Sequence, residues 1–209
     1  MSIGSGRLEA YDRLAPCFAS PMLMLGRQRC HVKEYADAAD FFKRRYGVEE
    51  YAELDLYSEG DVRYRLDLND DLSELSARFG SVVNLGTLEH VWDVHAAWSN
   101  ALRFVRLGGY FVSCAPVAGF DGHGIHVTGS RWIAEFVGMN GFEILDLWED
   151  SDAHGRFKVP KNRTVMWLAA RKTLHLQREI HNWRIRGSIY TDMLAKPAQG
   201  RKAGARAWW

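Results

Sequence analysis

The sequence of 209 residues has few cysteines and no long apolar run, and each absence excludes a class of protein. Cys17, Cys30 and Cys114 are odd in number and lack the paired spacing of zinc ligands, so neither a disulfide framework nor a zinc site is expected. No apolar stretch approaches the roughly 20 residues of a membrane-spanning helix. Residues 1–13 are polar and lack the apolar core of a secretory signal. The sequence therefore predicts a cytoplasmic protein without a membrane span.

Net charge is also low, at +1, but this total hides an uneven distribution along the chain. Residues 1–170 carry 18 Lys and Arg against 24 Asp and Glu, a net charge of −6. Residues 171–209 carry 9 basic against 2 acidic side chains, a net charge of +7. This change in charge predicts three parts: an N-terminal segment over 1–20, a folded domain over 21–172, and a basic extension over 173–209.

The basic extension interleaves Lys and Arg with tryptophans, and it has one weak helical pattern over 174–185. Such a segment can bind nucleic acid, an anionic membrane surface, or an acidic protein surface. Because the body of this chain is acidic, we favour docking on that body or on a second copy, which would form a homo-oligomer. Nucleic acid is the less favoured partner.

Strand-like stretches alternate with helix-like stretches between residues 21 and 170. This alternation favours parallel strands joined by helical crossovers. The last two strands are joined by a polar connection over 149–163 without a helical pattern, which predicts one antiparallel edge strand. The expected fold is α/β, a doubly wound, mostly parallel seven-stranded sheet with helices on both faces. Strands are expected at 21–26, 51–56, 62–68, 81–86, 110–115 (ending before Pro116), 142–147 and 164–170, and helices at 32–46, 71–79, 93–105 and 130–139.

Three segments of this domain carry a recognisable pattern. Residues 82–91 read VVNLGTLEHV, residues 106–112 read RLGGYFV, and residues 138–144 read GMNGFEI. Together they resemble the class I S-adenosylmethionine-dependent methyltransferases, and the type 11 methyltransferases among them, over roughly residues 20–171. The resemblance implies a Rossmann-like methyltransferase fold with S-adenosylmethionine as the cofactor.

The resemblance also implies a set of cofactor-binding residues at the carboxyl ends of the strands, where open α/β sheets bind ligands. The loop after the first strand would hold the amino-acid end of the cofactor, a carboxylate after the second would accept hydrogen bonds from the ribose hydroxyls, and residues after the third and fourth would contact the adenine and line the cleft. In that order the residues are Gly26 and Arg27; Asp55; Asp67 and the backbone of Leu68; and Asn84, Leu85 and Gly86.

The loop after the first strand departs from the family pattern. Three spaced glycines are usual there, because the backbone must approach the cofactor without a Cβ in the way. This sequence has Gly26 followed by Arg27, Gln28 and Arg29. The loop therefore leaves two interpretations open: a methyltransferase with an atypical cofactor loop, and a non-catalytic scaffold that has lost cofactor binding.

Candidate catalytic residues lie in the segment DGHGIH over 121–126, which follows the fifth strand. A histidine is a suitable general base near pH 7 for an oxygen or nitrogen acceptor, so His123 and His126 are the predicted catalytic residues. His90 is expected to have a structural role at the start of a helix. Two imidazoles with Asp121 could hold a metal ion, but this spacing on a loop is too weak a signal, and no metal is predicted.

The predicted function is methyl transfer from S-adenosylmethionine to oxygen or nitrogen of a small molecule or a sugar. A third interpretation is a nucleic-acid methyltransferase that binds through the basic extension. The fourth strand is not followed by Asn-Pro-Pro-Tyr or Asp-Pro-Pro-Tyr, which argues against methylation of an exocyclic base amine.

Overall fold

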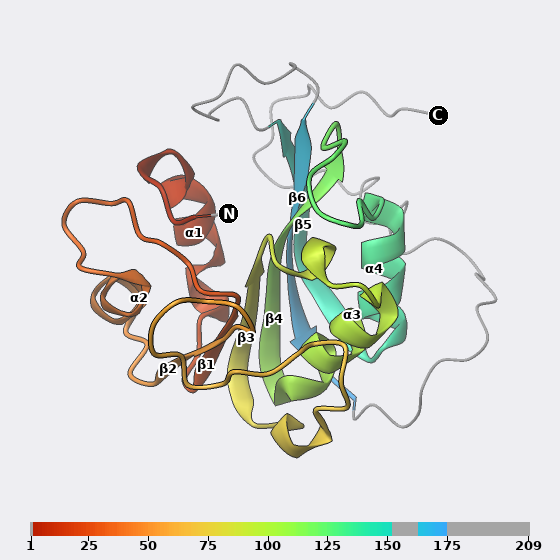
Figure 1. The fold of residues 1–209 in the computed structure, drawn as a ribbon, viewed down its shortest axis with the longest axis horizontal. Helices are drawn as coiled ribbons and strands as arrows, with labels where there is room; N and C mark the ends of the chain where they lie inside the picture. Colours follow the sequence, from red (N-terminus) through yellow and green to blue (C-terminus); the bar gives the residue numbers. More distant parts are fainter. Residues whose placement is uncertain (1, 152–162, 175–209) are drawn as a thin grey trace.

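The structure, a computed structural model, describes residues 2–151 and 163–174. Its centre is a twisted six-stranded sheet with the order β2-β1-β3-β4-β6-β5 (Figure 1). The first four strands in this order run parallel, and β6 is antiparallel to both of its neighbours. This is the predicted fold class. The strands are β1 (Met22–Leu25), β2 (Tyr51–Leu54), β3 (Phe79–Leu85), β4 (Val105–Ala118), β5 (Phe142–Ser151) and β6 (Thr164–Lys172).

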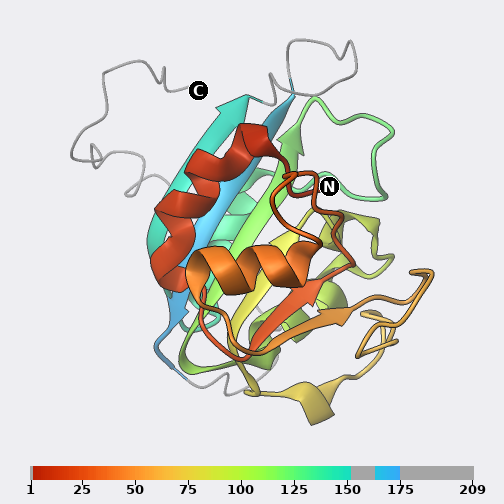
Figure 2. The same cartoon turned by 90° about the vertical axis from the view of Figure 1, so that its left-hand side faces the viewer.

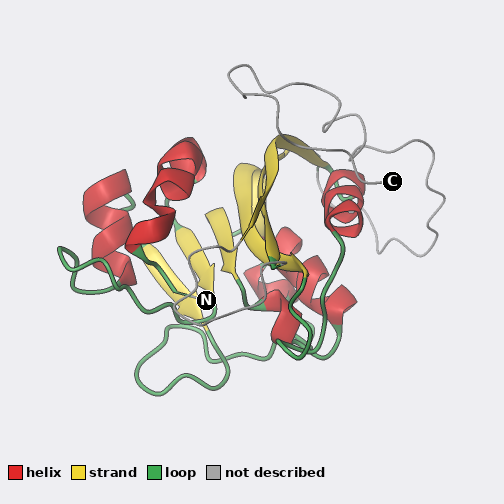
Figure 3. Ribbon diagram, turned by 90° about the horizontal axis from the view of Figure 1, so that it is seen from above, coloured by secondary structure: helices red, strands yellow, loops and turns green. Residues whose placement is uncertain are grey.

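Helices cover both faces of the sheet, so the molecule has three layers (Figure 3). α1 (Leu8–Leu14) and α2 (Ala38–Tyr46) lie on one face, which is turned toward the viewer in Figure 2. α3 (Val94–Phe104) and α4 (Ser130–Met139) lie on the other. Successive side chains of β1 point to opposite faces of the sheet, so this strand contributes to the hydrophobic core on both faces. Met22 and Met24 face α1 and α2, while Leu23 and Leu25 face α3 and α4. All four side chains are fully buried.

The sheet has six strands rather than the expected seven, because residues 62–68 do not form a strand. They make only one isolated bridge to the edge of β2, between Tyr64 and Leu54. Arg65 turns its guanidinium to the carbonyls of Ser58 and Gly60, and the Asp67 carboxylate accepts a hydrogen bond from the Asn69 backbone N–H at 2.9 Å. These side-chain bonds to local backbone replace the strand ladder, so β2 remains the edge strand.

Two expected helices are shorter than predicted. The segment 71–79 contains only a 3-10 turn, Ser73–Leu75, because Ala77 takes a left-handed conformation (φ 54°) that a helix cannot continue through. α2 begins at Ala38 rather than near residue 32, since Asp37 is its N-cap and accepts a hydrogen bond from the Asp40 backbone N–H.

The antiparallel strand was predicted at the sheet edge, but β6 lies between β4 and β5, and β5 is the edge. β4 also continues past Pro116 to Ala118. Beyond Cys114 it pairs with β6 alone, and a strand with one free side tolerates a proline. β5 extends to Ser151, into the stretch expected to be a connection. Residues 152–162 of that connection lie outside the described residues. The helix expected at 174–185 also lies outside them, except for its first residue.

Residues 2–20 pack against the domain through α1. Tyr11 is fully buried, with its ring edge-on to Phe41 of α2 and Trp167 of β6, at centroid distances of 5.6 Å each. Arg13 of α1 forms a two-pronged ion pair with Asp146 and lies 4.0 Å above the Trp148 ring. Within the described part of the chain, no helix has both the length and the apolar character needed to cross a membrane.

Candidate active site

A cavity of about 600 Å³ opens at the carboxyl ends of β1, β2 and β3. The chain leaves β1 toward β2 on one side and returns to β3 on the other, so this is the point where the strand order reverses, and open α/β sheets bind ligands there. A second cavity, of about 500 Å³, lies between residues 27–31, α2 and β2, and among the described residues none of β3 lines it. Of the predicted cofactor residues, the larger cavity is lined by Gly26, Arg27, Asp55, Asp67, Leu68 and Gly86.

The loops after β1 and β3 meet in a tight contact. Gly26 has φ +72°, and a Cβ at this position would collide with the hydroxyl of Thr87. That hydroxyl donates a hydrogen bond to the Leu25 carbonyl at 2.7 Å. Gly86, with φ +76°, also needs the freedom of glycine. The two glycines let the β1 and β3 loops approach each other at the floor of the cavity.

Asp55 fixes the wall of the cavity after β2. One carboxylate oxygen accepts a hydrogen bond from the Arg27 backbone N–H at 2.8 Å, and the other accepts from the N–H groups of Tyr57 and Ser58 at 2.9 and 2.8 Å. A carboxylate offers about four acceptor positions. Asp55 therefore ties the β1 loop to its own turn, and the described residues use three of its acceptor positions.

Arg27 and Gln28 stand where the resemblance implies a glycine-rich loop. The Arg27 guanidinium donates to the Glu59 carbonyl and lies 3.7 Å from the Glu53 carboxylate. Gln28 is buried and lines the cavity, and within the described residues its side-chain carbonyl oxygen has no hydrogen-bond donor. A buried acceptor without a partner is costly unless a ligand supplies the donor.

Asn84 and Leu85 were predicted to line the cleft, but the structure places both behind the cavity wall, fully buried. The Asn84 side chain donates to Ser113 Oγ at 2.9 Å and accepts from the backbone N–H groups of Thr87 and Leu88 at 3.0 and 3.3 Å. It therefore shapes the turn that leads into the 3-10 helix Leu88–His90.

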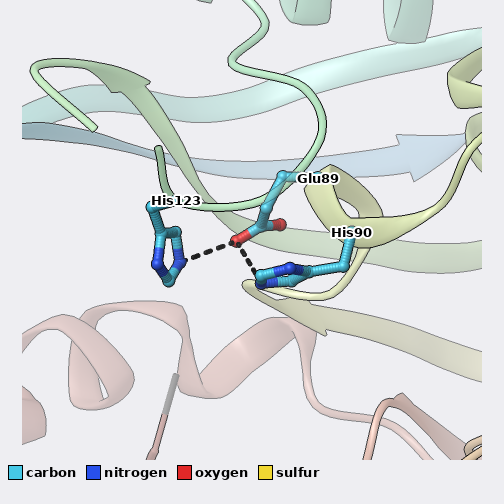
Figure 4. A group of neighbouring side chains, drawn as sticks. All are labelled: Glu89, His90 and His123. Carbon is cyan, nitrogen blue, oxygen red and sulfur yellow. Dashed lines mark ion pairs between the residues drawn. The ribbon is translucent and has the colours of Figure 1, made fainter. Parts of the chain in front are cut away.

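That turn brings three side chains together at one end of the cavity: Glu89 and His90 from the 3-10 helix, and His123 from the loop after β4 (Figure 4). Nε2 of His90 and Nε2 of His123 each lie 3.9 Å from the same oxygen of Glu89. The two imidazole rings are edge-on to each other, with centroids 5.1 Å apart. His90 lines the cavity, so it connects the trio to the remaining cavity residues.

The electrostatics of the trio follow from burial. The Glu89 side chain is only 4% exposed, and burial raises the pKa of its carboxyl to about 7. Burial lowers the pKa of His90, and the neighbouring His123 lowers it further. Burial also lowers the pKa of His123. Near neutral pH both imidazoles are thus neutral and able to accept a proton or a ligand.

His126, the other predicted catalytic residue, has a different position. Its Nε2 is 2.8 Å from the Trp92 carbonyl, so this nitrogen carries the proton that the bond needs. The backbone N–H groups of Ile125 and His126 both donate to the Glu89 carbonyl, at 2.8 and 3.0 Å. A Cβ on Gly124, which has φ +77°, would collide with that same carbonyl. The loop is therefore fastened to the backbone of Glu89, and His123 is the histidine that joins the trio.

Sequence reasoning missed Glu89 and favoured a structural role for His90. A signal was present, because a carboxylate directly before a histidine, in an apolar stretch at the end of a buried strand, is difficult to bury without a partner. Its pairing with His123 depends on a loop far along the chain and could not be read from spacing.

Comparison with known proteins identifies the fold. No family model matches the chain, and no curated protein matches it. Solved structures do: a candidate methyltransferase from Bacillus halodurans matches with a TM-score of 0.59 and 15% identity, over 82% of this chain and 100% of the other. The 1,6-didemethyltoxoflavin-N1-methyltransferase of Burkholderia thailandensis matches with a TM-score of 0.54 and 19% identity, over 79% and 76%.

A third solved structure gives a similar match. A S-adenosylmethionine-dependent methyltransferase from Methanosarcina mazei matches with a TM-score of 0.54 and 12% identity, over 73% of this chain and 92% of the other. At such low identities the likeness concerns the fold. The chain has the fold of the class I S-adenosylmethionine-dependent methyltransferases.

Proposed function

We propose that this protein is a S-adenosylmethionine-dependent methyltransferase that acts on a small molecule. The observation that carries the proposal is the cavity at the strand-order reversal. It combines carboxylates after β2 with a buried amide oxygen on the β1 loop that has no hydrogen-bond partner among the described residues. Its volume, about 600 Å³, is ordinary for a cofactor site. The neighbours of known activity include enzymes crystallised with S-adenosylhomocysteine or with S-adenosylmethionine.

The residues present fit this cofactor. The remaining acceptor position of Asp55 suits a ribose hydroxyl, and Asp67 with the backbone of Leu68 lies on the wall that would face the adenine. The Gln28 side-chain oxygen has no hydrogen-bond donor among the described residues, and by turning toward the cavity it could accept from the α-ammonium group of the methionine moiety. Gln28 would thus replace, with a side-chain acceptor, part of what a glycine-rich backbone usually provides.

The acceptor would bind at the end of the cavity where the trio lies. The cofactor supplies an electrophilic methyl group, so the chain must position the acceptor in line with it and exclude water. Neutral His123 or His90 could take the proton that an oxygen or nitrogen acceptor loses. Among the neighbours, one binds a toxoflavin precursor and another geranyl diphosphate, which supports a small-molecule acceptor. A sugar hydroxyl belongs to the same proposal.

A second candidate function is a non-catalytic scaffold with the methyltransferase fold. It is favoured by the three backbone hydrogen bonds that already engage Asp55, and by Arg27 and Gln28 in the place of glycines. In this case the cavity would not bind the cofactor.

Calorimetric titration with S-adenosylmethionine and S-adenosylhomocysteine separates the two functions. For a methyltransferase we expect micromolar binding of both, weakened roughly tenfold or more by Asp55→Ala through the loss of a charge-assisted hydrogen bond. The matched control is Glu74→Ala, which removes an exposed carboxylate on the 3-10 turn Ser73–Leu75 and should leave binding unchanged. Absence of binding at millimolar concentration would establish the scaffold instead.

A further inference from the structure

Glu89, His90 and His123 offer three ligand atoms that converge on one point. One ligand atom from each of the three side chains lies within 4.8 Å of the other two. In Figure 4 the Glu89 carboxylate is directed between the two imidazole rings, which approach it from different chain segments. Two imidazole nitrogens and one carboxylate oxygen form a donor set typical of first-row divalent metal ions.

The Glu89 carboxyl is buried with few polar contacts in the described part of the chain. Neither carboxylate oxygen receives a hydrogen bond from another described residue, although the side chain is only 4% exposed. The only described cation-forming groups within ion-pair distance are the two imidazoles, each at 3.9 Å. A buried carboxylate with so few partners is unfavourable, so the group either holds a proton or binds a cation.

The backbone around the trio is held in place by bonds that do not involve the three side chains. The Asn84 side chain accepts hydrogen bonds from the N–H groups of Thr87 and Leu88, and so fixes the turn into the 3-10 helix that carries Glu89 and His90. The loop that carries His123 is fixed to the Glu89 carbonyl by the N–H groups of Ile125 and His126. The three ligand atoms are therefore held close together before any ion binds, which reduces the entropic cost of binding.

We propose that Glu89, His90 and His123 bind a divalent first-row transition-metal ion, of which Zn²⁺ is the best representative. At metal–ligand distances of about 2.1 Å, ligand atoms lie roughly 3.4 Å apart. The two distances from Glu89 to the histidines, 3.9 Å each, would contract by about 0.5 Å, and the two imidazole nitrogens, which lie within 4.8 Å of each other, would also move together. Three protein ligands leave at least one coordination position open, as in catalytic rather than structural zinc sites.

Metal binding stands independently of methyl transfer, but its use follows from the proposed function. His90 lines the cavity, so the ion would border the position proposed for the acceptor. An acceptor with a hydroxyl or carbonyl oxygen could occupy the open position, where the ion would lower the pKa of a hydroxyl. With the ion bound, this effect would replace His90 or His123 as the means of removing the acceptor's proton. This use of the ion rests on the proposed function, and it narrows the acceptor to molecules that carry an oxygen ligand.

Titration of the full-length, chelator-treated protein with Zn²⁺ and Co²⁺ tests the site. We expect one equivalent of Zn²⁺ to bind with the highest affinity, and Co²⁺ to give the visible absorption of a low-coordinate complex with nitrogen and oxygen ligands. Glu89→Gln keeps the shape of the side chain, and His123→Ala removes a ligand at a half-exposed loop position. Each should weaken the binding of Zn²⁺ about 100-fold or more, and each should remove the Co²⁺ spectrum.

His31→Ala is the control, because His31 is an exposed histidine that belongs to neither the trio nor the larger cavity. It should leave both signals unchanged. Thermal unfolding of every variant shows whether it is folded, and His90→Asn provides a further ligand variant should one of the others unfold. Zn²⁺ binding that is equally tight in Glu89→Gln, His90→Asn and His123→Ala would overturn the proposal, as would an absence of binding to the wild type. Because cofactor binding is measured separately, failure of this site and failure of the proposed function are distinguishable.

Discussion

Lys172 is a basic side chain buried at the end of β6, only 4% exposed. Its ammonium group donates hydrogen bonds to the carbonyls of Leu102 and Val105, at 3.1 and 2.7 Å, and so binds the C-terminal end of α3. Cations are favourable at this end of a helix. Burial nevertheless lowers the pKa of Lys172 from 10.5 to about 8, and the nearby Arg103 adds to the effect.

This lowered pKa predicts the direction of a pH effect on stability. Between about pH 8 and pH 10.5 the unfolded chain holds the Lys172 proton more tightly than the folded chain, so the contribution of this residue to the free energy of unfolding rises with pH. The unfolding free energy of the wild type minus that of Lys172→Met should therefore increase from about pH 7 to about pH 10. Urea denaturation of both proteins across this range measures it, and a difference that stays constant would contradict the assignment.

At the scale of elements, the loop after β4 depends on one close approach of two backbones. Gly122 and Gly124 share the same left-handed conformation, with φ +77°. A Cβ on Gly124 would meet the Glu89 carbonyl, whereas a Cβ on Gly122 would meet nothing within 4 Å. An alanine at Gly122 would therefore cause backbone strain alone, whereas an alanine at Gly124 would cause both strain and a steric collision.

We expect Gly122→Ala to cost about 1 kcal/mol through strain alone, and Gly124→Ala to cost about 2–4 kcal/mol because the loop must also move away from Glu89. Gly124→Ala should in addition weaken any binding that depends on His123, while Gly122→Ala should not. Urea denaturation and the Zn²⁺ titration measure the two effects. Equal losses in both variants would show that the contact with Glu89 is unimportant.

The sequence predicted those elements whose pattern is local. The apolar run of β1 and the helical spacing of α3 and α4 identify these elements directly, and the helix expected to end at residue 46 does end there. The alternating pattern of 62–68 was misleading, because a strand also needs a partner. There Arg65 and Asp67 bind nearby backbone instead, a choice that depends on tertiary context.

The site was predictable to the extent that it follows from strand order. Asp55, Asp67 and Gly86 were expected at the strand ends, and they line one cavity. Two features could not be inferred: that Asn84 turns its amide to Ser113 rather than to the cavity, and that His123 rather than His126 meets Glu89. Both depend on which groups are left without partners after the chain folds.

At the scale of the whole molecule, the N-terminal segment and the sheet share one hydrophobic core. Tyr11 of α1 contacts aromatic rings of α2 and β6, which lie far apart in the sequence. Its hydroxyl is buried, and no described residue forms a hydrogen bond with it. The ring should therefore stabilise the fold, whereas the hydroxyl should not.

Tyr11→Ala should lower the free energy of unfolding by about 3–5 kcal/mol, because it leaves a cavity between α1, α2 and the sheet. Tyr11→Phe, the matched variant, should be neutral or stabilising by up to about 1 kcal/mol, since it removes only the unsatisfied hydroxyl. Urea denaturation compares the three proteins. A marked loss in Tyr11→Phe would mean that the hydroxyl has a partner after all.

The position of β6 has a consequence for synthesis on the ribosome. β4 and β5 precede β6 in the chain, yet neither can pair with the other, because β6 separates them in the finished sheet. While residues 164–172 are still inside the exit tunnel, one edge of β4 stays open and β5 has no neighbour among the described strands. Folding of this half must therefore wait until nearly the whole domain has emerged, and a nascent chain arrested before that point would expose an edge on which another chain could add.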